Sequence, residues 1–309
     1  MTWLSIVIPT YNRVNLICRA VESCLHNSLS GYEVIVVDDG STDGTNEILR
    51  RYSTDRLHTV RLGMNKGVCS ARTAGVEAAG GEWILFLDSD DELMPGALGT
   101  LEIKCRQAPP DIGRMAFMYV HDDGSTSPKP WNPGEVMDYQ KYLEWSERVN
   151  NSDFSNCIRR FTFNVVRFPC GGANESIYHL DFARAFKTLC CGDVIARVHN
   201  DAPDRLTHTR KGHLRHRLLN EANTRVTALL DINDRHGEEL RRFAPSRAWM
   251  FSRALISSAL MAGQKRLAFR AFLNHVRRYP WSYSVWGFLG MGLISKRAVA
   301  WVVALRRGT

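Results

Sequence analysis

The sequence predicts an α/β protein whose sheet is mostly parallel and flanked by helices, followed by a basic helical region. Two observations carry this prediction. The first ninety residues alternate short apolar runs with helical patterns, which is typical of a parallel sheet with right-handed crossovers. From residue 240 to residue 309 the chain has thirteen Lys and Arg and no Asp or Glu, whereas the whole chain has a net charge of +8. The rest of the chain is therefore mildly acidic.

The composition is that of an ordinary globular protein. Hydrophobic residues make up 44% and charged residues 23%, which excludes a globally disordered chain. The eight cysteines have no C-x-x-C pair and no zinc spacing, so we expect reduced, mostly buried thiols in a cytosolic protein. The chain enters a strand pattern at residue 3 without a basic leader or cleavage site, so we expect no signal peptide.

The elements of the amino-terminal part follow from their patterns. Short apolar runs bounded by turn formers predict buried strands at residues 4–9, 32–37, 57–62 and 83–87. Helical spacing of apolar or small residues predicts helices at residues 16–25, 45–52 and 68–79. Asn12 precedes the first of these helices and is expected to cap it.

Three carboxylates follow the strand at residues 83–87. Asp88 and Asp90 are one residue apart, which lets both side chains approach one cation. Hard divalent cations prefer carboxylate oxygens, and Mg²⁺ binds through one or two carboxylates together with substrate phosphates. We therefore expect a metal–diphosphate site. The alternative is an acidic turn in which Asp90 or Asp91 lies at the start of the following helix and caps it.

Other polar residues also fall directly after strands or in strand–helix turns. No G-x-G-x-x-G and no G-x-x-x-x-G-K-[ST] is present, so neither a dinucleotide fingerprint nor a P-loop explains them. A nucleotide held by acids at its base and ribose, and by a metal at its phosphates, would explain them. Because the carboxyl ends of parallel strands meet at one edge of a sheet, this edge should collect Thr10, Asp38, Asp39, Lys66, Asp88 and Asp90.

In this order and at this spacing, the motifs resemble those of glycosyltransferase family 2. They are IVIPTYNR at 6–13, VVDDGSTDGT at 36–45, NKG at 65–67, AR at 71–72 and FLDSDD at 86–91. The resemblance is close over the first third of the chain and loose over the middle third. It implies a GT-A fold, a nucleotide-diphosphate sugar donor with a UDP-sugar as first choice, and a divalent metal cofactor, Mn²⁺ or Mg²⁺.

The resemblance also implies roles for individual residues. It places Asp39 near the base or ribose and assigns the metal to Asp88, Asp90 and His199. Asp38 and Asp39 could instead form an Asx-type turn that satisfies loop amides, and His199 could be a hydrogen-bonded structural residue. Donor binding is assigned to Pro9, Thr10, Tyr11, Arg13, Asp38, Asp39, Lys66, Arg72, Asp88 and Ser89.

The middle region should supply the acceptor side. Its patterns predict helices at residues 94–107, 138–148 and 176–189, and strands at residues 112–120, 161–168 and 194–199. Trp131, in a Pro-rich loop, could stack on a sugar or fix the loop to the body of the protein.

The general base is expected near the start of the helix at residues 176–189. Family members commonly have a Glu-Asp pair there, whereas this chain has Asn174-Glu175 and, six residues further on, Asp181. Glu175 is the first choice for the base and Asp181 the second. Alternatively, Glu175 is a favourable charge in a first helical turn, and Asp181 is solvated or paired with Arg184.

The carboxyl-terminal segment predicts helices at residues 210–235, 248–262 and 264–279, followed by apolar runs at 281–294 and 298–305. Neither run reaches the ~20 residues that span a bilayer. Aromatic and aliphatic residues interleaved with Arg favour a helix lying on an anionic membrane surface. A helical cap on the catalytic domain and a dimer contact are the alternatives.

These observations predict a catalytic domain at 1–209 and a basic helical extension at 210–309. Within the first, residues 1–110 bind the nucleotide sugar and residues 111–209 the acceptor. The resemblance implies an inverting transferase, and the absence of Q-x-x-R-W favours a non-processive one. We expect a glycan or lipid-linked acceptor in cell-surface polysaccharide synthesis, at the cytoplasmic face of the inner membrane.

Three other functions compete with this prediction. A nucleotidyltransferase should have a Gly-rich loop after the first strand, where this chain has Pro9-Thr10-Tyr11-Asn12-Arg13. A nucleic-acid-binding protein would explain the basic end but not the acidic edge, so we expect no nucleic-acid partner. A catalytically inactive, glycosyltransferase-like nucleotide-binding protein would explain why Asn174-Glu175 replaces the usual pair.

Overall fold

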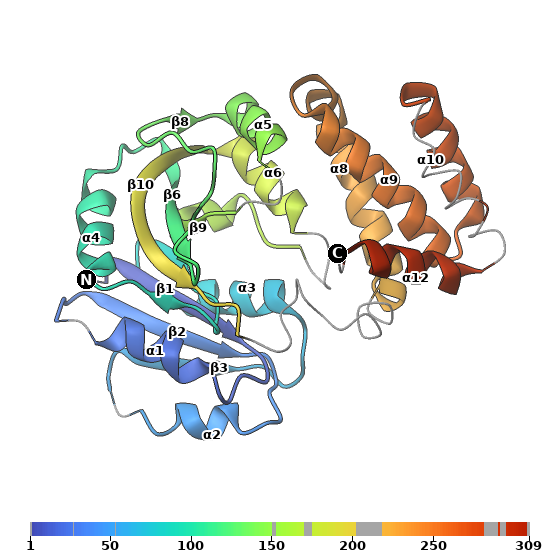
Figure 1. Ribbon diagram of the computed structural model, residues 1–309. Helices are drawn as coiled ribbons and strands as arrows, with labels where there is room; N and C mark the ends of the chain where they lie inside the picture. Colours follow the sequence, from blue (N-terminus) through green and yellow to red (C-terminus); the bar gives the residue numbers. More distant parts are fainter. Residues whose placement is uncertain are drawn as a thin grey trace. The chain divides into compact units, whose positions relative to one another are not determined.

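The computed structural model describes residues 2–26, 28–52, 54–149, 153–169, 175–201, 218–280, 290 and 295–307 (Figure 1). They form two compact units. The sheet unit comprises Met1–Gly171 and Tyr178–Ala202, and the helical unit comprises Gly172–Ile177 and Pro203–Thr309. The predicted boundary at 209/210, Asn174 and almost all of the apolar run at 281–294 lie outside the described residues.

A single sheet organises the sheet unit. Its main path has the order β3-β2-β1-β4-β9-β6-β10-β5, with β7 paired to β6 and β8 paired to β10. Strands β3, β2, β1 and β4 are mutually parallel, β9 is antiparallel to both of its neighbours, and β6 and β10 are again parallel to each other. The strands are β1 Leu4–Thr10, β2 Tyr32–Asp38, β3 Leu57–Arg61, β4 Trp83–Phe86, β5 Glu92–Leu93, β6 Ile112–His121, β7 Thr126–Ser127, β8 Val136–Met137, β9 Ser155–Arg159 and β10 Lys187–Val198.

Helices cover both faces of this sheet, so the unit has three layers. Alternate residues of a strand point to opposite faces. Thus Ile6 and Ile8 pack with α1 (Ile17–Leu25) and α4 (Ala97–Gln107), whereas Val7 packs with α3 (Val68–Ala78) and α6 (Ser176–Ala185). The predicted mostly parallel, helix-flanked α/β sheet followed by a helical region is confirmed.

Helix α3 lies very close to the sheet at Gly75. A Cβ atom at this position would come within 2.3 Å of Val7 Cγ1 and 3.2 Å of Val37 Cγ2. The absent side chain therefore lets the helix backbone approach β1 and β2. This close contact fixes α3 against β1 and β2, the strands whose carboxyl ends carry part of the candidate site.

One predicted strand was wrong, and one predicted helix was placed correctly but ends earlier than expected. Residues 161–168 do not form a strand. The strand in this region is β9, which begins six residues earlier, at Ser155, and a 3₁₀ helix follows it at Arg160–Asn164. Phe163, Val166 and Phe168 all pack into the core around Tyr178, so the apolar run is used for packing instead of strand pairing. The predicted helix at 176–189 ends at Ala185, and β10 begins at Lys187, earlier than expected.

Smaller connections complete the unit. The helix α2 is only Thr45–Leu49, and α5 is Tyr139–Arg148, with Asp138 accepting a hydrogen bond from the Lys141 amide at its start. Trp131 donates its Nε1–H to the Cys191 carbonyl (2.7 Å) and packs against Trp145, so it fixes its loop to the body of the unit. The described cysteines are free thiols, as expected, and all except Cys18 are buried.

The helical unit is built around α9. Helix α9 (Pro245–Met261) packs against α8 (Ala222–Phe243), α10 (Lys265–Arg278) and α12 (Lys296–Arg307). Its core contains Val226, Ile256, Leu260 and Phe272, each with an exposed fraction of 3% or less. Within the described part of the chain, no helix has the length and apolar character needed to cross a membrane.

Candidate active site

The carboxyl ends of the parallel strands bring the predicted donor-site residues to one edge. Thr10 ends β1 and pairs in register with Asp38, the last residue of β2. The loop that carries Asp88 and Asp90 begins one residue after β4, which is the neighbour of β1 on its other side. His199 follows β10 directly. These positions agree with the expectation that one sheet edge collects the polar residues.

The loops after β1 and β2 are joined to each other by hydrogen bonds. Asn12 has a left-handed φ of 51° and lies too far from α1 to cap it, since that helix begins at Ile17. Its side chain instead accepts from the Thr42 amide, which corrects the expected role of Asn12. The bonds between the two loops are Asn12 N to Ser41 Oγ (2.9 Å), Thr42 N to Asn12 Oδ1 (2.9 Å), Arg13 N to Thr45 Oγ1 (3.0 Å) and Val14 N to Asp43 Oδ2 (3.0 Å).

Asp43 is the acid on which this connection depends. Burial alone would raise its pKa, but hydrogen bonds from the Thr45 hydroxyl and from the Val14 and Thr45 amides outweigh burial and lower it. The carboxylate of Asp43 is therefore stabilised in its charged form. It holds both loops together in the pH range in which most enzymes work.

Asp38 and Asp39 are both buried and both bind loop amides. Asp38 Oδ1 accepts from the Ser41 amide (2.8 Å), and Asp39 accepts from the amides of Lys66 (2.8 Å) and Gly67 (2.7 Å). The hydrogen bonds from loop amides that the turn-forming alternative requires are therefore present for both acids. Burial raises the pKa of Asp39, and the two amide hydrogen bonds only partly offset this effect.

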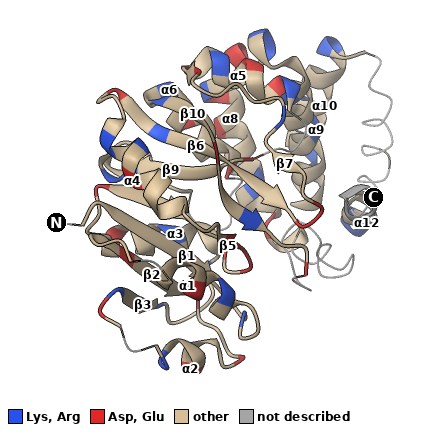
Figure 2. Ribbon diagram, turned by 60° about the vertical axis from the view of Figure 1, so that its left-hand side comes forward, with Lys and Arg blue, Asp and Glu red and all other residues tan. Residues whose placement is uncertain are grey.

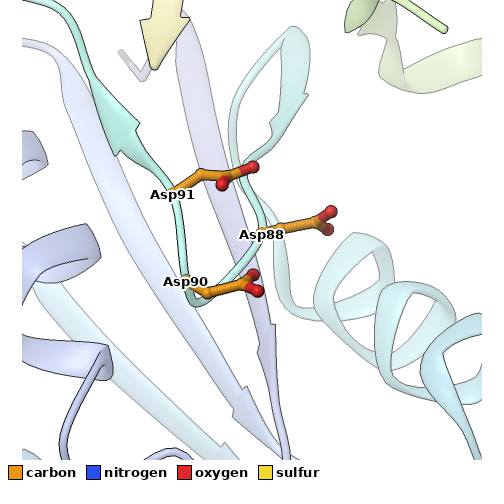
Figure 3. Close-up of side chains that lie close together, drawn as sticks. All are labelled: Asp88, Asp90 and Asp91. Atoms are coloured by element: carbon orange, nitrogen blue, oxygen red, sulfur yellow. The ribbon is translucent and has the colours of Figure 1, made fainter. Parts of the chain in front are cut away.

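The three acids after β4 form a compact group. One carboxylate oxygen each from Asp88, Asp90 and Asp91 lie within 4.8 Å of one another, and the three side chains extend to the same side of the loop (Figure 3). The helix-cap alternative is not what the structure has, because α4 begins at Ala97, after Gly96, with no side-chain cap. Oxygen-only ligands at this spacing fit a hard divalent cation such as Mn²⁺ or Mg²⁺.

His199 is placed beside this group but its ring is held by other acids. Its Nδ1 lies 2.9 Å from Asp122 Oδ1, and its Nε2 lies 3.3 Å from Glu92 Oε1. Its backbone amide donates to Asp91 Oδ1 (3.1 Å). His199 therefore positions Asp91 through its backbone, and its ring is oriented by two carboxylates.

Arg19, from α1, joins the acidic loop to the segment after β10. Its two terminal nitrogens contact the two carboxylate oxygens of Asp201 at 2.8 and 3.0 Å, and Nη2 also donates to the Asp90 carbonyl. The hydrogen bond from Arg19 is the main reason why the pKa of Asp201 is lowered. The acidic loop is thus fixed at its backbone from one side by Arg19 and at Asp91 by His199.

The remaining donor-site predictions fall around the same edge. Arg72, on α3, has its Nη2 3.3 Å from Asp88 Oδ1 and its guanidinium over the Phe86 ring. Ser89 is buried between the acids, and Tyr11 is exposed with 40% of its surface accessible. Pro9 pairs with Val37 inside the sheet, and Lys66 binds Asp39 through its backbone.

The two candidate bases lie near the start of α6 and within it. Glu175 directly precedes the helix and is grouped with the helical unit, whereas Asp181 lies inside the helix and is grouped with the sheet unit. Arg184, considered as a partner for Asp181, has its guanidinium 4.9 Å from the centre of the Tyr139 ring.

Sequence reasoning missed several residues of this edge. Asp91 was considered only as a helix cap, although it directly follows Asp90. Asp122 follows β6 at the same edge, and the rule that found Asp38 and Asp88 would have found it as well. A single Arg on a helix, such as Arg19, has no distinguishing pattern in the sequence. The pairing of Glu92 in β5 with Arg197 in β10 is equally invisible there.

A sheet of this order with acids at its carboxyl edge belongs to the class of doubly wound nucleotide-binding folds. Within that class, the family model described as "Glycosyl transferase family 2" matches residues 5–168. This chain therefore belongs to glycosyltransferase family 2.

Curated relatives match over about a third of the chain. The Rhizobium meliloti succinoglycan biosynthesis protein ExoO is 40% identical over 95 residues, which are 31% of this chain and 27% of ExoO. The Campylobacter jejuni GalNAc(5)-diNAcBac-PP-undecaprenol beta-1,3-glucosyltransferase is 34% identical over 110 residues, 35% of this chain and 36% of the relative. The matched region thus spans well under half the length of each relative.

Solved structures match over most of the chain. S. aureus TarS 1-349 in complex with UDP-GlcNAc has a TM-score of 0.59 at 16% identity, covering 90% of this chain and 92% of that one. The mannosyltransferase PcManGT from Pyrobaculum calidifontis, in complex with GDP-Man and Mn²⁺, has a TM-score of 0.55 at 17% identity, covering 98% and 86%. These similarities concern the fold.

Proposed function

We propose that this protein transfers a sugar from a nucleotide-diphosphate donor to a hydroxyl of a glycan or lipid-linked acceptor, with inversion at the anomeric carbon. The observation that carries the proposal is the group of Asp88, Asp90 and Asp91 at the carboxyl edge of a family 2 sheet. The same edge holds two more buried acids, Asp38 and Asp39, at the end of β2, which is separated from β4 by β1.

The donor is held by the loops after β1, β2 and β4. Thr10 Oγ1 and Asp38 Oδ2 are buried and have no hydrogen-bond partner among the described residues. Asp38 Oδ2 lies 3.7 Å from Arg61 Nε, so Thr10 Oγ1 is the buried polar atom for which we propose a donor contact. Asp39 keeps the Lys66–Gly67 turn in place beside the base and ribose. The complexes of TarS with UDP-GlcNAc and of PcManGT with GDP-Man support a nucleotide-sugar donor, and a UDP-sugar is our first choice.

Asp88 and Asp90 would hold a divalent cation, with Asp91 next to them. When bound, Mn²⁺ or Mg²⁺ stabilises the negative charge that develops on the departing diphosphate. Arg72 adds a positive charge at Asp88 and limits the repulsion between the acids. His199, which was predicted as a third ligand, would need to leave Asp122 or Glu92 to reach the cation.

The acceptor hydroxyl needs a general base on the face of the sugar opposite the diphosphate. Tyr178, near the start of α6, stacks on Phe168 with the two ring centres 4.1 Å apart. Phe168 packs in turn on Phe86 at the end of β4. One turn later, Phe182 lies under Arg114, near the start of β6. Within the sheet unit, α6 thus runs from the side of the acidic edge toward the opposite edge. Glu175 stays our first choice for the base and Asp181 the second, as the family resemblance implies.

Only one of the two acids can serve as this base. Glu175 precedes α6 whereas Asp181 lies within it, and a single displacement needs only one base. Glu175 would accept the proton from the acceptor hydroxyl as the new glycosidic bond forms. Asp181 would then be a solvated or ion-paired residue on α6, without a role in the reaction.

We further propose that the protein works in bacterial cell-surface polysaccharide synthesis, at the cytoplasmic face of the inner membrane. The relatives named for succinoglycan biosynthesis and for an undecaprenol-linked substrate support this role. A lipid-linked acceptor would place the reaction next to the bilayer. The helical unit would then contact an anionic membrane surface.

The test is a panel of nucleotide sugars with Mn²⁺ or Mg²⁺, measuring donor hydrolysis and transfer. Wild type is compared with Asp90→Ala, Glu175→Gln and Asp181→Asn. Asp111→Asn is the matched control, because Asp111 is an exposed acid just before β6, at the opposite edge of the sheet. We expect one donor to be turned over only with metal, Asp90→Ala to abolish turnover, and Asp111→Asn to behave as wild type.

The two candidate bases give distinct results in this assay. Glu175→Gln should still bind donor and metal but lose transfer by roughly 10²–10⁴-fold. If Glu175→Gln is fully active and Asp181→Asn is not, the base is Asp181. Metal-dependent donor binding without turnover by any variant would identify a catalytically inactive binding protein, and no donor binding at all would refute the proposal.

A further inference from the structure

Helix α10 has one face inside the helical unit and one face outside it. Its buried residues are Ala268, Ala271, Phe272 and His275, which recur at intervals of three and four. The helix α10 packs on α9, and α9 lies in turn against α8 and α12. The side of α10 turned away from α9 is therefore available to a partner, and its composition indicates which kind of partner it fits.

This outer face combines large apolar side chains with arginines. Phe269 is 51% exposed and Leu273, one turn later, is 40% exposed. Taking about 100° of rotation per residue, Arg266, Arg270 and Arg277 fall within ~60° of Leu273 and nearly opposite the buried residues. We call these five residues, Arg266, Phe269, Arg270, Leu273 and Arg277, the outer face of α10.

The helices α9, α10 and α12 carry no acid that could offset the positive charge of this face. There is no Asp or Glu anywhere from residue 240 to residue 309, and the Lys and Arg of α9, α10 and α12 are coloured blue in Figure 2. An arginine cluster without acids repels itself in water unless anions surround it. Two exposed apolar side chains lie beside these arginines. The combination favours a partner with an anionic surface and an apolar interior.

We infer that the outer face of α10 docks on a bilayer surface containing anionic phospholipid headgroups. Phe269 and Leu273 enter the boundary between headgroups and acyl chains, while the arginines bind lipid phosphates. The sequence pattern alone favoured the later segment, 281–305, for this contact. The inference deepens the proposed membrane location and rests on it, because it identifies the surface that holds the transferase beside a lipid-linked acceptor.

The test measures co-sedimentation of the full-length protein with vesicles. Phosphatidylcholine vesicles are compared with vesicles that also contain phosphatidylglycerol, at low and high salt. Since each basic residue near an anionic surface contributes about fivefold to affinity, Arg266→Gln/Arg270→Gln should bind roughly 25-fold more weakly. Phe269→Ser/Leu273→Ser should bind roughly tenfold more weakly, because it loses the apolar insertion.

Leu230→Ser on α8 is the matched control. Leu230 is 38% exposed, similar to Leu273, but it lies on a helix beside Asp231 and Asp234. Its substitution should leave vesicle binding unchanged. Circular dichroism of each variant confirms that the helical unit is folded, so that weaker binding reports on the surface alone.

Several outcomes would overturn the inference. These are equal binding to both vesicle types, wild-type binding by both α10 variants, or equal loss in Leu230→Ser. A DNA duplex that binds as tightly as the vesicles, with loss in the arginine variant but not in Phe269→Ser/Leu273→Ser, would identify a nucleic-acid surface instead. Donor hydrolysis without vesicles is measured on the same samples: vesicle binding without donor turnover refutes the proposed transferase activity while supporting the docking face.

Discussion

Arg19 is the residue that links the acidic loop to the rest of the sheet unit. One guanidinium contacts a carboxylate on Asp201 and a backbone carbonyl on Asp90, so it holds two segments seventy and more residues away from it in the chain. A planar guanidinium presents several donors in fixed directions, which an ammonium group cannot do. Arg19 therefore positions the acids without being one of the ligands.

We expect Arg19→Ala to weaken Mn²⁺ and UDP binding by roughly tenfold, because a charged hydrogen bond that fixes the Asp90 backbone is lost. Arg19→Lys should recover part of this affinity, since it keeps one donor but not the paired contact. Titration of free Mn²⁺ by electron paramagnetic resonance measures the effect without relying on turnover.

Arg106→Ala is the control for this prediction. Arg106 pairs with Glu102 within α4, on the surface, and its side chain is 73% exposed. Its removal should leave Mn²⁺ affinity unchanged. Equal metal affinity in wild type and in both Arg19 variants would show that Arg19 does not position the acidic loop.

Individual site residues could be predicted from the sequence where a polar residue type directly follows a predicted strand. Asp38 and Asp88 were found because they follow apolar runs that form parallel strands. Arg19 could not be found, since its partner Asp201 is 182 residues away and only the fold brings the two together. The His199 ring was expected to be a metal ligand or a hydrogen-bonded structural residue. Its Nδ1 lies 2.9 Å from Asp122, while its Nε2 has no hydrogen-bond partner among the described residues, so its role as a ligand stays a prediction.

Among the elements, α3 depends on a close approach to the sheet. Gly75→Ala gains helix propensity but places a methyl group against Val7 and Val37 in a packed core. We expect a net loss of about 1–3 kcal/mol in the free energy of unfolding, measured from urea transitions.

The matched substitution is Gly99→Ala in α4. A Cβ atom at Gly99 would meet nothing within 4 Å, and its φ is not in the left-handed region. This variant should therefore gain about 0.5–1 kcal/mol from helix propensity alone. Stabilisation by both substitutions would show that α3 can move away from the sheet at little cost.

The contact between α9 and α10 should depend on pH through His275. Burial, with a contribution from the nearby Arg253, lowers the pKa of this histidine to about 4. Its Nδ1 lies 2.9 Å from Ser252 Oγ, and its ring packs against Trp249 and Tyr279. The folded protein thus keeps His275 neutral well below the pH at which the unfolded chain, with a pKa of about 6.5, takes up a proton.

The sign of the effect follows from this difference. Above about pH 6.5 neither state binds the proton and stability is complete; between about 6.5 and 4 only the unfolded state binds it, so stability falls as pH falls. His275→Asn, which keeps a polar group near the Nδ1 position, should lower the melting temperature at all pH values but flatten its decline between pH 7 and 4. An equally steep decline in both proteins would contradict the prediction.

The element predictions failed where tertiary context outweighed local preference. Ser155–Arg159 has little apolar character, yet it forms β9 because β4 and β6 supply hydrogen-bond partners on both sides. Cys157 and Ile158 fill opposite faces of the sheet. The strongly apolar 161–168 run, in contrast, turns through a 3₁₀ helix and packs around Tyr178. Periodicity alone could not distinguish these uses of the two segments.

At the scale of the whole molecule, the two units should respond differently to ligand, because the candidate metal site lies in the sheet unit. Mn²⁺ with UDP at a hundred times the dissociation constant stabilises the folded state by about 2.7 kcal/mol, or roughly 5–10 °C in the melting temperature of a domain this size. Only the transition of the sheet unit should shift, and a chelator should reverse the shift. Asp88→Asn should remove it, whereas Asp111→Asn should retain it; an equal shift in both transitions would contradict this division.

The paired loops after β1 and β2 also limit how new donor specificity could be engineered. Three of the four hydrogen bonds that join the loops run from backbone amides of the first loop to side chains of the second, and the fourth runs from the second loop to the Asn12 side chain. A chimera that receives only one loop from a relative therefore keeps donors without their acceptors. The two segments should therefore be transplanted together, as one exchangeable cassette. Recombination breakpoints placed between residues 14 and 41 would be expected to give mostly inactive hybrids, even when every parent sequence is active.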